Sequence, residues 1–159
     1  MKITINNRQK IMKLRHNSIK KFLNLICAKA EKAQKNNQQI KELCLTVTDN
    51  VGIRKLNLKY FKSDTITDVI SFRYQPVPGN LYPIGDIIVN AEKALSPPPA
   101  IARRWSPQKE FALYIAHGCD HLYGGEDETL QKRRKMRRKE LRWLSDPKIA
   151  AQIPKLLCS

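Results

Sequence analysis

Residues 106–127 read SPQKEFALYIAHGCDHLYGGED, and this stretch decides how the rest of the chain is interpreted. Ser106 followed by Pro107 is typical of a helix start, because the serine side chain can cap the helix and proline suits its first turn. Apolar residues then recur at helical spacing until the adjacent glycines Gly124 and Gly125 end the pattern. The stretch therefore predicts a helix closed by a sharp glycine turn.

The same stretch carries candidate metal ligands. His117 and His121 are four residues apart, so both imidazoles project from one face of the helix and can meet a single ion. Asp127 follows the glycine turn and can fold back as a third ligand. Two imidazoles and one carboxylate leave a fourth tetrahedral position open, as in catalytic zinc sites. We therefore predict that His117, His121 and Asp127 bind one divalent ion on this helix-turn segment, with Zn2+ as the first candidate.

The spacing of these ligands resembles that of the metzincin proteases, which makes a metallopeptidase one alternative function. In those enzymes a glutamate directly follows the first histidine and acts as the general base. Here that position is Gly118, which cannot accept a proton, so the peptidase mechanism lacks its base. Asp120 points to a different face of the helix, and we expect it to be a cap, a hydrogen-bond acceptor behind a ligand, or a surface charge.

Outside this stretch the chain alternates strand and helix patterns. Period-two or β-branched apolar runs predict strands, and apolar residues three and four apart predict helices. Ser18 is the expected N-cap of the first helix. The expected strands are residues 1–6, 42–48, 69–74 and 87–89, and the other expected helices are residues 18–35, 50–60 and 129–144. This order predicts a single domain over residues 1–159 of the α+β or α/β class, with a small mixed sheet of about four strands covered by helices.

A closer resemblance covers about residues 40–144 in uninterrupted order. His117-Gly118-x-x-His121-Leu122-x-Gly124 is similar to the metal motif HGxxHLxGxDH of the bacterial rRNA maturation endoribonucleases, the YbeY family. The LN, Y, D, TDVLSF and GDI stretches of that family, and the Met and Glu of its closing helix, are similar to residues 56–57, 60, 64, 67–72, 85–87, Met136 and Glu140. The resemblance implies a metal-dependent, single-strand-specific endoribonuclease in rRNA maturation and ribosome quality control. It also implies an rRNA precursor as substrate and the small ribosomal subunit as a further partner.

Two positions depart from the pattern of the family. Its third metal histidine falls on Asp127, a harder ligand that is still competent to bind zinc. Its arginine after the tyrosine falls on Phe61, so a phosphate contact is expected to pass to Lys59, Lys62 or Arg73, or to be lost. A weakly catalytic rRNA-binding or ribosome-binding module is therefore a second alternative.

The charge of the chain points to a polyanionic partner. Thirty Lys and Arg residues against 14 Asp and Glu give a net charge of +16, and no long basic amphipathic membrane anchor is visible. Residues 132–139, KRRKMRRK, carry much of the excess. We interpret them as a helix that contacts RNA phosphates through Arg133, Arg134, Arg137 and Arg138, the alternative being a solvated helix face. The residues expected to turn this helix toward the core are Leu130, Met136, Leu141 and Leu144.

Cysteine usage and hydropathy predict the compartment. None of the four cysteines has the CxxC spacing of a thiolate zinc site or a redox pair, so we expect free thiols in a reducing environment. No apolar run approaches the length that spans a bilayer. These features predict a cytoplasmic protein with no membrane association.

Overall fold

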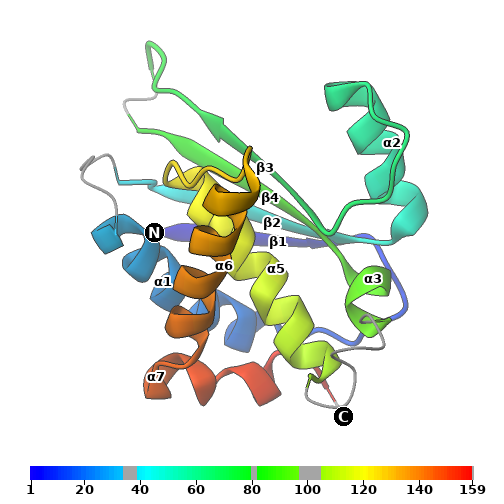
Figure 1. Cartoon of the computed structure of the whole chain (residues 1–159), viewed down its shortest axis with the longest axis vertical. Helices are drawn as coiled ribbons and strands as arrows, with labels where there is room; N and C mark the ends of the chain where they lie inside the picture. The colour runs from blue at the N-terminus through cyan, green and yellow to red at the C-terminus, as the bar shows by residue number, and fades with distance from the viewer. Residues whose placement is uncertain (34–38, 80–81, 97–104, 159) are drawn as a thin grey trace.

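The fold is a mixed four-stranded sheet with helices on both faces (Figure 1), which confirms the predicted α+β class. The computed structural model describes residues 1–33, 39–79, 82–96 and 105–158. In these ranges the strands are β1 (Lys2–Asn7), β2 (Glu42–Thr48), β3 (Val69–Tyr74) and β4 (Ile84–Asn90). The helices are α1 (His16–Ala33), α2 (Asn50–Phe61), α3 (Ala91–Leu95), α5 (Pro107–Leu122), α6 (Leu130–Leu144), α7 (Pro147–Ala150) and the 3-10 turn η1 (Ile153–Lys155).

The strands are arranged in the order β1-β2-β4-β3. β1, β2 and β4 run parallel, and β3 pairs antiparallel with β4 as the outer strand. The register places Leu45 beside Ile87 and Ile87 beside Ser71. Since parallel neighbours need a crossover, α1 connects β1 to β2 on one face of the sheet.

The two faces of the sheet bury two apolar clusters of different size. Leu43, Leu45 and Val47 of β2 belong to the larger cluster, which α1 and α5 complete. Ile70 and Ile88 form the smaller cluster with α2 on the opposite face. Successive strand side chains point to opposite faces, so β3 presents Val69, Ser71 and Arg73 to α5 and presents Ile70, Phe72 and Tyr74 to the α2 side.

Helix α5 crosses the sheet at very close range, and Gly118 permits this approach. A Cβ at position 118 would lie 2.7 Å from Ile87 Cγ2 and 3.0 Å from Val69 Cγ2, closer than ordinary packing allows. The hydroxyl of Ser71 donates to the Gly118 carbonyl at 3.2 Å, which links β3 to the helix. Packing therefore explains why a glycine occupies the position at which metzincins carry their glutamate.

Helix α6 packs against α5 with an apolar stripe that differs in part from the predicted one. Met136 and Leu144 are buried as expected, together with Glu140 and Trp143. Leu130 is 62% exposed, so the prediction that it faces the core is wrong. It is the first residue of α6, and the buried stripe begins only at Met136. Leu141 is partly buried against the larger cluster.

Most predicted element positions are confirmed, with shifts at their ends. The first helix begins at His16, so Ser18 lies inside it and is not the N-cap. β4 extends from Ile84 to Asn90, well beyond the predicted residues 87–89. Residues 34–35 of the predicted first helix lie outside the described ranges. The four cysteines are free thiols, as predicted. None of the helices in the described ranges has the length and apolar character needed for a membrane span.

A candidate metal centre beside a basic pocket

The two predicted histidines meet at one edge of α5. From Glu110 to Leu122 every residue of this helix is buried except His117 and His121. These two histidines are therefore the residues of this part of α5 that solvent can reach. Their ring centroids are 4.5 Å apart, and the two Nε2 atoms are 3.2 Å apart. The i, i+4 spacing thus brings both imidazoles to one point, as the sequence predicts.

Asp127 reaches the same point after the glycine turn. Gly124 has φ +90°, a conformation that favours glycine, and it reverses the chain directly after α5. Asp127 Oδ2 then lies 3.8 Å from His117 Nε2 and 3.7 Å from His121 Nε2. Three ligand atoms, one from each residue, lie within 4.8 Å of one another. The structure therefore brings the three predicted ligands together.

The outer nitrogens of both rings are occupied, which leaves the inner nitrogens as electron-pair donors. His121 Nδ1 lies 3.0 Å from the Gly125 carbonyl oxygen, which can only accept, so Nδ1 must carry the proton. His117 Nδ1 lies 2.6 Å from Glu140 Oε1, and a carboxylate accepts in the same way. In neutral rings both Nε2 atoms then carry lone pairs, directed at each other and toward a carboxylate. Such a set fits a divalent cation, and outer partners of this kind usually orient metal-binding histidines.

Glu140 is the functional residue that sequence reasoning did not assign to the site. Its side chain is fully buried, and its Oε2 lies 3.6 Å from Arg137 Nη1, close enough for an ion pair but too long for a hydrogen bond. Burial lowers the pKa of His117, but the hydrogen bond and the charge of Glu140 outweigh this effect and raise the pKa overall. Two signals in the sequence could have assigned Glu140 to the site. It stands on the apolar stripe of its helix, and it matches the glutamate of the family's closing helix.

Asp120 joins the two helices of the site. It is fully buried, and Lys139 of α6 donates to its Oδ1 at 2.7 Å. Burial raises the pKa of Asp120, and the ion pair with Lys139 opposes this rise without cancelling it. Of the three predicted roles for Asp120, surface charge is wrong, because its carboxylate links α5 to α6.

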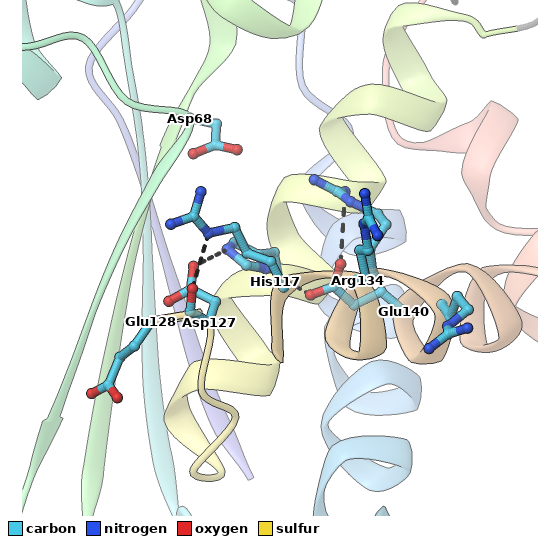
Figure 2. Close-up of a pocket in the computed structure, with 9 residues that line it drawn as sticks. Asp68, His117, Asp127, Glu128, Arg134 and Glu140 are labelled. Carbon is cyan, nitrogen blue, oxygen red and sulfur yellow. Dashed lines mark hydrogen bonds and ion pairs between the residues drawn. The ribbon is translucent and has the colours of Figure 1, made fainter. Parts of the chain in front are cut away.

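The metal centre opens into a pocket of about 710 Å³ whose far wall is the basic helix. Figure 2 shows His117 and Asp127 turned toward each other and Arg134 and Glu140 projecting from α6. The four α6 arginines among the predicted RNA contacts all line this pocket, which is bounded by Asp68, His117, Asp127, Glu128, Arg133, Arg134, Arg137, Arg138 and Glu140. Arg133 Nε donates to the Asp127 carbonyl oxygen at 2.9 Å, so one arginine also holds the ligand loop.

The other two predicted RNA contacts have local partners. Arg73 Nη1 donates to the Leu122 carbonyl oxygen at 2.7 Å, at the end of α5, and its guanidinium lies over the Tyr123 ring. Lys62 is the C-cap of α2 in the left-handed conformation, with φ 58°, and its exposed side chain donates from Nζ to the Lys59 carbonyl oxygen at 3.5 Å. Contact of either residue with RNA stays a prediction.

Phe61, which occupies the position of the family arginine, packs among aromatic rings. Its ring stacks on Phe72 with a centroid distance of 5.8 Å and an interplanar angle of 5°. Phe72 belongs to the smaller apolar cluster, on the α2 side of the sheet, whereas the metal ligands lie on the α5 side. Position 61 therefore presents an apolar ring on the other face of β3.

Comparisons with known proteins agree on one family. The family model described as Endoribonuclease YbeY matches residues 4–147. The chain is similar to the endoribonuclease YbeY of Syntrophomonas wolfei, with 34% identity over 117 residues, 68% of this chain and 74% of the relative. It is 30% identical over 147 residues to that of Clostridioides difficile, covering 88% of this chain and 92% of the relative. A solution structure from Thermotoga maritima aligns over 92% of this chain and 94% of that one, with 20% identity and a TM-score of 0.49. On the family model and these curated relatives, the chain belongs to the endoribonuclease YbeY family, as its motifs predicted.

Proposed function

We propose that this protein is a metal-dependent endoribonuclease that cleaves single-stranded RNA, acts in rRNA maturation and ribosome quality control in the cytoplasm, and forms one domain over residues 1–159. One observation carries the proposal: His117, His121 and Asp127 cluster together, and two of them, His117 and Asp127, line the same pocket as four arginines of α6. The family also supports it, because the relatives are named as endoribonucleases. An rRNA precursor is the proposed substrate, and the small ribosomal subunit is a proposed partner.

The ligand set supports one divalent ion, with zinc as the proposed metal. His117 Nε2, His121 Nε2 and Asp127 Oδ2 would hold it, which leaves a further position open as catalytic zinc sites require. When bound, zinc supplies a Lewis acid that makes water more acidic and neutralises charge on a phosphate oxygen. The Glu140 carboxylate and the Gly125 carbonyl keep both imidazoles turned toward this position through their Nδ1 protons.

The arginines of α6 supply the charge that an RNA backbone requires. Their positions form two i, i+4 pairs along the helix, so that two adjacent rows of guanidinium groups face the pocket. A guanidinium offers two parallel donors to phosphate oxygens and stays charged at any physiological pH. Phosphate contacts carry no sequence information, so these residues are proposed to hold the strand without reading its bases. Arg73 and Lys62 are proposed as further contacts outside this wall.

The metallopeptidase alternative is disfavoured by the packing of α5. The required glutamate would stand at position 118, where even a single Cβ would lie 2.7 Å from Ile87. A peptidase base cannot occur there without moving the helix off the sheet. Digestion of casein by the purified protein is the direct check on this alternative, and we expect none.

The proposed activity is tested by metal analysis together with RNA cleavage, with and without a chelator. We expect one bound divalent ion, cleavage of single-stranded RNA, loss of cleavage with chelator, and recovery when zinc is returned. His121→Ala removes a ligand and is expected to lose both metal and cleavage. His16→Ala is the matched control, because His16 is exposed at the start of α1, and it is expected to keep both. Full cleavage by metal-free His121→Ala protein would rule out metal catalysis.

A further inference from the structure

Four aromatic rings gather on the side of β3 that faces α2. Phe72 lies at their centre, with ring centroids at 4.9 Å from Tyr60, 5.8 Å from Phe61 and 6.4 Å from Tyr74. Tyr60 and Phe61 are the last two residues of α2, and Tyr74 is the last residue of β3. We call these four residues the aromatic platform. They come from two elements and meet on the opposite side of the sheet from the metal ligands.

Three of the four platform rings are more exposed to solvent than they would need to be if they only covered the smaller apolar cluster. Tyr60 is 51% exposed, Phe61 54% and Tyr74 49%, while Phe72 is intermediate and contacts the smaller cluster. Rings that served only to cover that cluster would gain stability by sinking further into it, at about 25 cal/mol for each Å² of apolar surface removed from water. Contiguous exposed apolar surface of this kind commonly marks a binding site.

Charge around the platform favours a polyanion as its occupant. Lys59 Nζ lies 5.1 Å from the centroid of the Tyr60 ring, and Lys62 directly follows Phe61 at the end of α2. Two acids lie near the platform: Asp64 is paired with Arg54 through two hydrogen bonds of 2.7 Å, and Asp86, the register partner of Phe72 on β4, accepts a hydrogen bond from the Tyr74 hydroxyl. Aromatic faces beside cations are the combination that binds single-stranded nucleic acid, because unpaired bases stack on the rings while the cations hold the phosphates.

The platform and the metal pocket lie on either side of one strand. Asp68, which lines the pocket, directly precedes β3, and β3 is one of the two edge strands of the sheet. The four residue steps from Asp68 to Phe72 extend over about 13 Å, the length of about four stacked nucleotides. We propose that the aromatic platform stacks unpaired bases of the RNA strand whose phosphates lie in the arginine-lined pocket, the strand passing over the edge of β3. This inference rests on the proposed function and names how the site selects single-stranded RNA.

Binding of a short labelled single-stranded RNA to the full chain, with chelator present to prevent cleavage, tests the proposal. Tyr60→Ala and Phe61→Ala are each expected to weaken binding about tenfold, because a stacked base loses its ring. Phe61→Leu keeps an apolar side chain without a π face and is expected to weaken binding like alanine, whereas Phe61→Trp keeps binding. Leu58→Ala is the matched control, because Leu58 is apolar, 48% exposed and on the same helix.

An RNA with abasic residues separates stacking from general loss of binding. The wild-type protein is expected to bind the abasic RNA more weakly than the normal RNA, and this difference is expected to be smaller for each platform variant, because one ring fewer stacks a base. Their salt dependence stays that of the wild type, because no phosphate contact is removed. If Phe61→Leu and Tyr60→Ala bind normal RNA as the wild type does, the proposal is overturned and the platform is left for a protein partner. An equal loss on both RNAs would overturn it too. In a separate assay with zinc and without chelator, absence of cleavage by the wild-type protein would refute the proposed function, and the binding comparison would still test the platform.

Discussion

Replacing Glu140 tests how far the proposed metal site depends on a residue that contacts a ligand, His117, without being a proposed ligand itself. Glu140 Oε1 lies 2.6 Å from His117 Nδ1, and the side chain is fully buried. Glu140→Gln keeps the size of the side chain and an oxygen that can accept from Nδ1, but it removes the charge. Glu140→Ala removes both the charge and the acceptor. The pair of variants therefore separates the effect of charge from that of orientation.

The magnitude follows from the role of such outer partners. Removing the group that holds a ligating histidine typically costs 10-fold to 100-fold in metal affinity, which is about 1.4 to 2.7 kcal/mol. Glu140→Gln is expected near the lower figure, because the amide oxygen still fixes the ring. Glu140→Ala is expected near the upper figure, because His117 is then free to rotate its Nε2 away from His121. Both variants lose the ion pair with Arg137, whose Nη1 lies 3.6 Å from Oε2.

The assay is competition for zinc against a chromogenic chelator, with thermal unfolding measured on the same samples. Glu128→Gln is the matched control, because Glu128 lines the same pocket but pairs with Lys132 in solvent, with a side chain that is 79% exposed. We expect it to bind metal like the wild type. A folded Glu140→Ala protein with unchanged zinc affinity would refute the reasoning, because the orientation of His117 would then not depend on this carboxylate.

Three further predictions concern the basic helix, the packing of α5 and an ion pair distant from the site. Changing the four pocket arginines to glutamine is expected to weaken RNA binding about equally for all sequences. The slope of log affinity against log salt concentration is expected to become shallower by up to about 3, because four phosphate contacts are lost. Changing the exposed Lys20 and Lys21 of α1 is the control and is expected to leave this slope nearly unchanged. Gly118→Ala places a Cβ 2.7 Å from Ile87 and is expected to lower stability by about 1–3 kcal/mol, seen as a lower Tm in thermal unfolding; an unchanged Tm would mean that α5 can shift at no cost. The hydrogen bond from Lys29 holds the pKa of Asp146 below its ordinary value of 3.8, so this carboxylate stabilises the fold above that pH and loses its effect as the pH falls through the folded-state pKa. The Tm difference between wild type and Asp146→Asn is therefore expected at neutral pH and absent in strong acid.

The elements that the sequence predicts well are those set by local periodicity and caps. Ser106 caps α5 through the Lys109 amide, and Thr129 caps α6 through the Lys132 amide, so both helices begin directly after a polar capping residue with extended backbone. The clustering of the three candidate metal ligands was predictable for the same reason, since an i, i+4 pair and a glycine turn are local features. The start of the first helix was less well predicted, because no capping side chain marks its beginning at His16.

The remaining features depend on which faces of distant elements meet. Glu140 and His117 are 23 residues apart, and their contact exists only because α6 packs back on α5. The same packing buries Asp120 beside Lys139, which no local pattern distinguishes from a surface charge. The partner of Arg73 was equally hidden, because its side chain points to the end of α5 and not along its own strand. Periodicity predicts that a helix has a buried face but does not identify the partner that buries it.

The unequal burial of the three candidate ligands predicts an order of assembly for the proposed metal site. Both histidines stand on α5, whose other residues from Glu110 to Leu122 are buried, so their backbone is held by the core whether or not an ion is bound. Asp127 stands on the connection between α5 and α6 and has a side chain that is 37% exposed. In hydrogen exchange, the amides of α5 are therefore expected to stay slow in the metal-free protein, while those around Asp127 slow down only on loading. The ion would therefore bind first to the two preformed imidazoles, and Asp127 would coordinate it in a second step that orders the connection between α5 and α6.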